Sequence, residues 1–182
     1  TVDEETGVTG AMKLQDGMLR GKRLINIDSE DDGQIFIGCA GGIDTLAKMH
    51  YKSEIINHKS QIAIRLSVTG LLGGHSGDDI NKGRANANQL IVWFLARIWP
   101  QTEIQLARIE GGNLRNAIAR KAEATVVIPM AYKEQIRIEW NHFVAQMENV
   151  FGEVEKEMRM ELETTDMPET VIPAEKAYRL IM

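Results

Sequence analysis

Apolar and polar residues alternate most regularly between residues 61 and 68, where every second side chain is a large apolar one. This pattern predicts a half-buried β-strand, because successive side chains of a strand point to opposite faces. Weaker alternation predicts strands at residues 103–109, where the phase is imperfect at the end, and at residues 158–162. A run rich in Val and Thr predicts a further strand at residues 122–128.

Apolar residues recur at helical spacing in two longer segments. The first predicted helix covers residues 87–98 and is stopped by Pro100, and the second covers residues 136–154. Together with the strands, the order of elements is βαββαβ. This order predicts an α+β, ferredoxin-like fold, with a four-stranded antiparallel sheet and two helices on one of its faces.

The first 57 residues carry a different pattern. An apolar stripe predicts one helix over residues 8–19, which Gly21 ends, and short strands are predicted at residues 24–27 and 34–38. The organisation of the chain therefore changes near residue 58, and we expect a domain boundary there.

Three acidic residues are the candidate metal ligands or general base of this first segment. If another strand precedes the chain, Glu4, Glu5 and Asp28 follow the carboxyl ends of parallel strands, where open α/β sheets place their ligand sites. Neighbouring side chains of an extended chain point to opposite sides, so we expect Glu4 and Glu5 to act separately. One could ligate a metal ion while the other serves as a general base. An acidic loop that caps a helix is the alternative interpretation.

Two glycine-rich turns supply further candidates. The first, Gly70–Gly77, contains His75 and allows the backbone to approach a ligand closely. It lacks the Lys-Ser/Thr ending of a phosphate-binding loop, which argues against a nucleotide, and a solvated turn histidine is the alternative. The second, Gly111-Gly112, leads into Asn113–Arg120, whose amide and guanidinium groups suit carbonyls and carboxylates. Its alternative is a capped turn with exposed arginines.

Composition narrows the function classes. A chain of 182 residues can bury a core, and its net charge of −5 argues against a nucleic-acid partner. The sequence shows neither an apolar run long enough to span a membrane nor a signal peptide. A single cysteine excludes an internal disulfide and fits a reducing, cytoplasmic compartment. The chain starts inside an apparent site motif and ends early in a predicted helix, so we expect a piece of a longer protein.

Six short motifs occur in order over residues 3–120. They are Asp3–Gly7, Asn26–Glu30, Gly38–Gly42, Gly70–Gly77, Asn86–Asn88 and Gly111–Ile118. This ordered set resembles the bacterial aminoacyl-histidine dipeptidases. These enzymes belong to the dinuclear zinc peptidase family that also includes carboxypeptidase G, carnosinase and aminoacylase.

The resemblance implies a role for each candidate residue. Glu4 matches the general base that takes a proton from the metal-bridging water, while Glu5 and Asp28 match ligands of one zinc ion each. His75 matches the catalytic lid histidine that polarises the substrate carbonyl, and in dimeric members it reaches into the partner subunit's active site. Asn116 matches an asparagine that contacts substrate.

The same resemblance implies an architecture and an activity. Residues 1–57 would be part of the catalytic α/β domain, residues 58–166 the lid and dimerisation domain of a homodimer, and residues 167–182 the start of a further helical segment. The reaction would be hydrolysis of Xaa-His dipeptides by a water that two zinc ions activate. Zinc comes from the resemblance, because carboxylates alone suit manganese or magnesium equally well.

The chain also departs from the family pattern. The family has an upstream His-x-Asp and a late histidine, whereas the histidines here stand at positions 50, 58, 75 and 142, none with an aspartate two residues later. The dinuclear site cannot be completed from this chain, so we expect the chain alone to be inactive. The alternatives are an aminoacylase or carboxypeptidase of different specificity, or a non-catalytic dimerisation module.

Overall fold

A computed structural model of the chain divides into two units, Thr1–Met49 and His50–Met182. The residues that it describes are 9–25, 27, 32–38, 43, 45–56 and 60–182.

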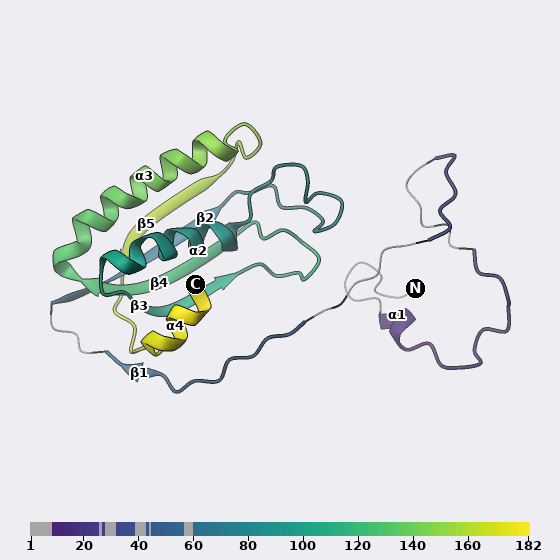
Figure 1. Cartoon of the computed structure of the whole chain (residues 1–182), viewed down its shortest axis with the longest axis horizontal. Coiled ribbons are helices and arrows are strands. Elements are labelled where there is room, and N and C mark those ends of the chain that lie inside the picture. The colour runs from purple at the N-terminus through teal and green to yellow at the C-terminus, as the bar shows by residue number, and fades with distance from the viewer. Residues whose placement is uncertain (1–8, 26, 28–31, 39–42, 44, 57–59) are drawn as a thin grey trace. The chain divides into compact units, whose positions relative to one another are not determined.

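Four antiparallel strands form the centre of the second unit (Figure 1). The central strand β2 (Gln61–Thr69) pairs with β4 (Ala122–Pro129) on one side and with β5 (Arg159–Thr165) on the other, and β3 (Gln105–Gly111) pairs with β4. The sheet order is thus β3-β4-β2-β5. The predicted four-stranded antiparallel sheet and its βαββαβ order are confirmed.

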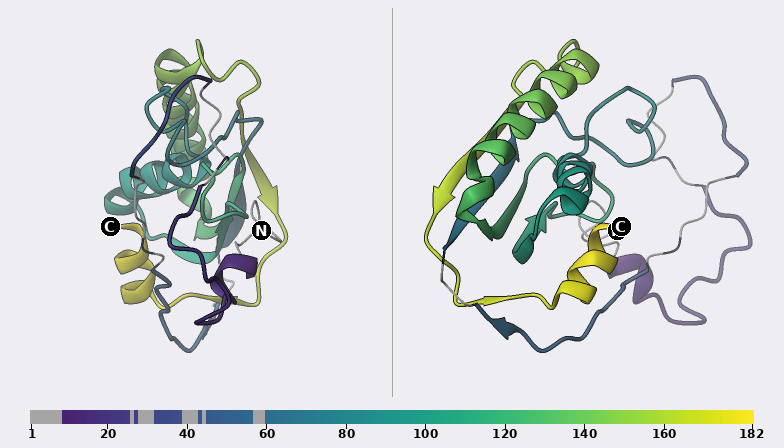
Figure 2. Two further views of the ribbon diagram at one scale, coloured as in Figure 1. Left: turned by 90° about the vertical axis from the view of Figure 1, so that its right-hand side faces the viewer. Right: turned by 60° about the vertical axis from the view of Figure 1, so that its left-hand side comes forward.

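One face of this sheet is covered by helices, as Figures 1 and 2 show. They are α2 (Ala87–Ile98), α3 (Lys133–Phe151) and the C-terminal α4 (Ala174–Ile181). Two 3₁₀ turns, Trp99–Gln101 and Met130–Tyr132, follow α2 and precede α3. The predicted helices are therefore confirmed, and α2 ends two residues before Pro100 because proline cannot continue an α-helix.

The alternating apolar residues of β2 supply the sheet side of the core. They point to the helices and are 9% exposed or less: Ile62, Ile64, Leu66 and Val68. On the helix side, the ring of Phe94 meets Trp140 edge-on, with ring centres 4.7 Å apart, and lies 5.4 Å from Phe143. This aromatic cluster joins α2 to α3 above the sheet.

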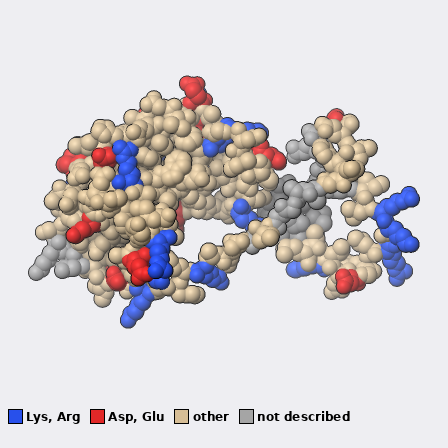
Figure 3. Space-filling view, in the orientation of Figure 1, with Lys and Arg blue, Asp and Glu red and all other residues tan. Residues whose placement is uncertain are grey.

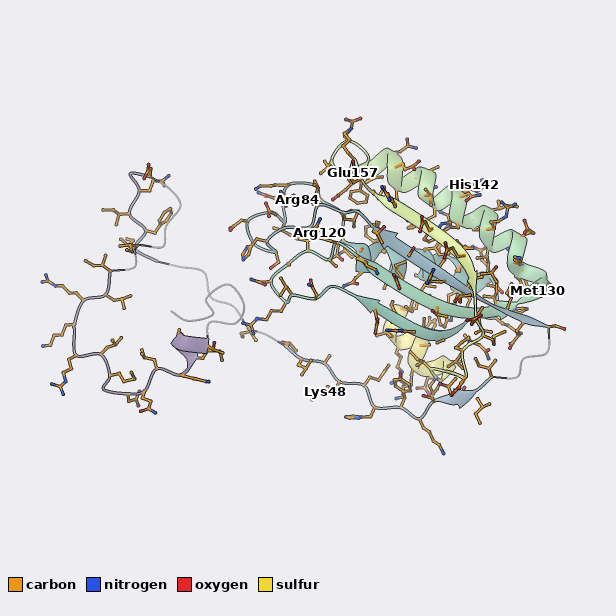
Figure 4. The ribbon with its side chains drawn as sticks, turned by 180° about the vertical axis from the view of Figure 1, so that it is seen from behind. Lys48, Arg84, Arg120, Met130, His142 and Glu157 are labelled. Carbon is orange, nitrogen blue, oxygen red and sulfur yellow. The ribbon has the colours of Figure 1, made fainter. Side chains whose placement is uncertain are left out.

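The opposite face of the sheet is mostly polar. It faces the viewer in Figure 4, which shows the molecule from behind. It carries ion pairs such as Arg65–Glu163, between β2 and β5. A small two-stranded sheet, β1 (Glu54–Ile55) with β6 (Thr170–Val171), contributes to a second apolar cluster there. That cluster consists of Ile56, Ala63, Val127 and Val171. On the face that is turned to the viewer in Figure 1, positive and negative side chains are interspersed, as Figure 3 shows.

The first unit contains less regular structure than its pattern predicts. Its described helix, α1, covers Thr9–Met12 only, so the helix expected over residues 8–19 is wrong beyond Met12. Leu14, Met18 and Leu19 are 50–63% exposed. An isolated helix of this length is marginal in water, and the described residues of this unit offer these side chains no buried surface to pack against.

The two strands expected in the first unit are also wrong. The described residues of 24–27 and 34–38 form neither helix nor strand. Ile25, Ile35 and Ile37 are almost fully exposed. A strand needs a neighbour for its backbone N–H and C=O groups, and no strand is present among the described residues of this unit.

Within the described parts of the chain, every helix is too short or too polar to cross a membrane.

Candidate functional site

The two glycine-rich turns lie side by side at one end of the four-stranded sheet. β2 and β3 both run antiparallel to β4, so the turns that follow them leave the sheet at the same end of the strands. The N–H of Ser76 donates to the carbonyl of Asn116 at 2.9 Å, and the N–H of Ile118 donates to the carbonyl of Gly74 at 2.8 Å. The structure thus brings together the segments that carry His75 and Asn116, two of the predicted site residues.

The imidazole of His75 is oriented by its own loop. Its Nδ1 accepts hydrogen bonds from the backbone N–H groups of Gly77 and Asp78, at 3.2 and 3.3 Å. The neutral ring then carries its proton on Nε2. The Asp78 carboxylate also lies 3.5 Å from Nδ1, but at 89% exposure it is screened by water and binds the ring only weakly. The ring is half exposed, so Nε2 can donate to a ligand outside the loop.

Asp79 fixes the backbone of the same loop. Its Oδ2 accepts from the N–H of His75 at 2.7 Å, Lys82 Nζ lies 2.7 Å from Oδ1, and Arg84 lies 3.1 Å from Oδ2. The Lys82 ammonium, the His75 N–H and the Arg84 guanidinium hold the pKa of Asp79 below its usual value. A Cβ at Gly74 would collide with both members of the Asp79–Arg84 pair, and the φ of Gly74 is +131°. Glycine is therefore required where the backbone passes this ion pair.

Two arginines hold the first part of the loop. Arg84 Nη1 donates to the carbonyl of Gly73 at 2.6 Å, and Arg120 Nε donates to the carbonyl of Leu71 at 2.9 Å. Figure 4 shows Arg84 and Arg120 near each other at this edge of the sheet. Arg120 comes from the second turn, so it links the two turns through a side chain as well as through the backbone.

The Asn86–Asn88 motif has a structural role at the start of α2. The side chain of Asn86 accepts from the N–H of Asn88 at 3.0 Å and is the N-cap of the helix. The N–H of Ala87 donates to the carbonyl of Ala119 at 2.9 Å. This motif therefore attaches the second turn to a helix whose other face is buried in the core.

Two pockets flank Gly111–Asn113. One, of about 580 Å³, includes Arg120, and the other, of about 420 Å³, includes Asn88. His75 and Asn116 line neither of these pockets, and both residues are exposed. They stand on an open rim, where they can supply hydrogen-bond donors to a carbonyl or carboxylate but do not by themselves enclose a substrate.

The predicted general base and metal ligands, Glu4, Glu5 and Asp28, lie outside the described residues. No group of three His, Cys, Asp or Glu side chains within the described ranges could hold a metal ion. The roles of Glu4, Glu5 and Asp28 therefore stay predictions.

Sequence reasoning missed three residues that shape the rim. Asp79, Arg84 and Glu155 all bond to the backbone of the His75 loop. Charged residues in turns follow no periodicity, so the hydrophobic pattern contains no signal for them. The glycines at positions 73 and 74 were the available signal, because they leave room for Arg120, Arg84 and Asp79.

Comparison with known proteins identifies the domain that carries this rim. Residues 56–155 match the family model described as the peptidase dimerisation domain of M20 peptidases. The chain belongs to the M20 peptidase family. That domain includes β2 to α3 and both glycine-rich turns.

Two dipeptidases are similar to almost the whole chain. The cytosol non-specific dipeptidase of Escherichia coli K12 is 38% identical over 164 residues, which are 90% of this chain and 34% of that protein. The crystal structure of the aminoacylhistidine dipeptidase of Vibrio alginolyticus is 35% identical, with a TM-score of 0.78, over 100% of this chain and 37% of that one. The chain thus spans about a third of the length of these two relatives.

Proposed function

We propose that this chain is part of a metal-dependent dipeptidase, in which residues 58–166 form the lid and dimerisation domain. The observation that carries the proposal is 38% identity to a dipeptidase over 90% of the chain. The similarity reaches well beyond the dimerisation domain, so it also supports a contribution of residues 1–57 to the catalytic domain. The name of the Escherichia coli relative supports a cytosolic location.

Xaa-His dipeptides are the proposed substrates. The relative of known structure is named an aminoacylhistidine dipeptidase, whereas the Escherichia coli relative is named non-specific. A related aminoacylase or carboxypeptidase is the alternative. A panel of dipeptides and acylated amino acids separates these activities. A dipeptidase should cleave the dipeptides faster, whereas one of the alternative enzymes should cleave the acylated amino acids faster.

The proposed mechanism divides the chemistry between the two segments. Glu5 and Asp28 are carboxylates and suit divalent metal ions as ligands, and zinc would supply a water of lowered pKa. Glu4 would take the proton of the attacking water and pass it to the leaving amine. His75, with its proton on Nε2, would donate to the carbonyl oxygen as negative charge develops there. Asn116, held beside it, would bind the substrate through its amide group.

Hydrolysis of an aminoacyl-histidine dipeptide by the complete dipeptidase tests this proposal. Activity should disappear when a chelator is added and return when zinc is restored. A folded, metal-loaded protein that cleaves no dipeptide would contradict the proposal.

The Glu4→Gln substitution tests the role of the proposed base. Glutamine keeps the shape of the side chain but cannot take a proton, so we expect turnover to be lost while the metal content, measured by elemental analysis, is retained. Glu134→Gln, at an exposed position of α3, is the matched control and should leave both unchanged. Normal turnover in the Glu4→Gln enzyme would exclude this residue as the base.

A further inference from the structure

A buried carboxylate holds both ends of the His75 loop. Among the described residues, Glu155 is the one polar or charged residue that is buried, at 2% exposure. It lies in the turn between α3 and β5, where its N–H donates to the carbonyl of Phe151 at 2.8 Å and its carbonyl accepts from Met158 at 3.1 Å. The turn thus fixes the backbone from which this side chain extends.

The two carboxylate oxygens of Glu155 have separate partners. Oε2 accepts from the N–H of Leu72 at 2.7 Å, and Oε1 accepts from the N–H of Ala85 at 2.9 Å. Leu72 and Ala85 are 13 positions apart and lie on either side of His75 in the sequence. One buried side chain therefore closes the loop at its base.

The chemistry of this contact requires a carboxylate. A buried charge is costly unless hydrogen bonds satisfy it, and these two N–H donors do so. Both oxygens must accept at once, which an ionised carboxylate can do. A glutamine at position 155 would turn an NH₂ group toward one of the two N–H donors.

The contacts of Glu155 complete a set that fixes the backbone before His75. The carbonyls of Leu71 and Gly73 are held by Arg120 and Arg84, and the carbonyl of Gly74 accepts from Ile118. The N–H of Leu72 lies between these held carbonyls, and it donates to Glu155. Removing the carboxylate would therefore free the backbone at Leu72, between the two carbonyls that the arginines hold.

We propose that Glu155 is a positioning residue for His75: its carboxylate anchors both ends of the loop and so sets where the imidazole Nε2 meets the substrate. The inference rests on the proposed function, in which His75 donates to the reacting carbonyl. Misplacement of a catalytic group by about 1 Å can cost about a hundredfold in rate. Glu155 acts on the reaction through the loop and need not touch the substrate.

The test uses Glu155→Gln in the complete dipeptidase. We expect kcat to fall between about tenfold and a hundredfold, with a smaller change in KM. Hydrogen exchange measured by mass spectrometry should become faster in peptides covering residues 72–85. Glu153→Gln is the matched control, because Glu153 lies in the same turn but is 99% exposed. It should change neither quantity.

A double-mutant cycle with His75→Ala separates positioning from general stability. If Glu155 acts through His75, Glu155→Gln should cause no further loss of kcat once the imidazole is gone. A full additional loss in that background would overturn the proposal, as would unchanged exchange or unchanged kcat in the single variant. Loss of activity in His75→Ala alone, with a normal Glu155→Gln enzyme, would reject the inference and leave the proposed function standing. A wild-type enzyme without dipeptidase activity would instead reject the proposed function.

Discussion

His75 is presented with its Nδ1 already used by two backbone N–H groups, so the proton of the neutral ring lies on Nε2. This arrangement needs no substrate, and it leaves Nε2 as a donor on the exposed rim. A donor that is oriented beforehand costs no reorganisation when negative charge develops on a carbonyl oxygen. The geometry of His75 therefore suits electrostatic stabilisation better than proton abstraction.

The His75→Ala substitution removes this donor. In the proposed dipeptidase we expect kcat to fall about a hundredfold to a thousandfold, the usual effect of losing one such donor. His142→Ala, at an exposed position of α3, is the control and should retain normal kcat. A ¹⁵N NMR spectrum of the wild-type ring should show the Nε2–H tautomer. Observation of Nδ1–H would contradict the assigned hydrogen bonds.

Single site residues could be predicted from the sequence only where they belong to a recognisable motif. His75 and Asn116 could be selected because glycines surround them and because the motifs resemble a known family. Their proximity could not be read from the sequence, since it depends on the pairing of two turns that lie about 40 positions apart. Glu155 was invisible for the same reason, because its partners Leu72 and Ala85 are brought to it by the fold.

Secondary-structure elements of the second unit followed their periodicity closely. β2, α2 and β4 begin and end within a residue or two of the predicted ranges, because one face of each element is buried in a shared core. The imperfect phase predicted for the strand at 103–109 also has a structural cause. The pairing of β3 shifts between Leu106 and Arg108, which is a β-bulge that reverses the alternation.

The same reasoning gave wrong predictions for the elements of the first unit. Periodicity shows which residues could share an apolar face, but it does not supply the surface that covers this face. The stripe over residues 8–19 has no such cover among the described residues of its unit, and its apolar side chains remain exposed. Most helical stability in proteins comes from packing rather than from propensity.

The Phe94→Ala substitution tests how far the second unit depends on packing between α2 and α3. Phe94 is fully buried against Trp140 and Phe143, so we expect the free energy of unfolding to fall by about 3–5 kcal/mol. Urea unfolding of the 182-residue chain measures this change. Gln89→Ala, at an exposed position of the same helix, should change it by less than about 0.5 kcal/mol. Similar effects of the two substitutions would contradict the assigned core.

The whole chain combines a well-packed second unit with a first unit whose described residues bury little. The second unit has its own core and its own sheet, and it contains the peptidase dimerisation domain. It therefore has the features of an independently folding part. The proposed base and metal ligands, Glu4, Glu5 and Asp28, belong to the first unit, whereas His75 and Asn116 belong to the second. The proposed chemistry is thus divided between the two units, while the described core lies in the second.

This division leads to a prediction for the 182-residue chain studied alone. We expect it to be folded and dimeric, because the second unit is a peptidase dimerisation domain with a complete core. Sedimentation velocity at several concentrations measures the association. A chain that remains monomeric at every concentration would contradict the proposed homodimer.

We expect the same chain to lack dipeptidase activity even with zinc present. His75 and Asn116 can bind and polarise a carbonyl, but hydrolysis also needs an activated water, and this sequence contains no His-x-Asp, which the family pattern uses to hold the metal ions. Release of histidine from an aminoacyl-histidine dipeptide measures this. Zinc-dependent release that the Glu4→Gln substitution abolishes would contradict the prediction, because it would place a complete hydrolytic centre within these residues. Release that survives the substitution would instead point to a contaminating peptidase, since the proposed base would be gone.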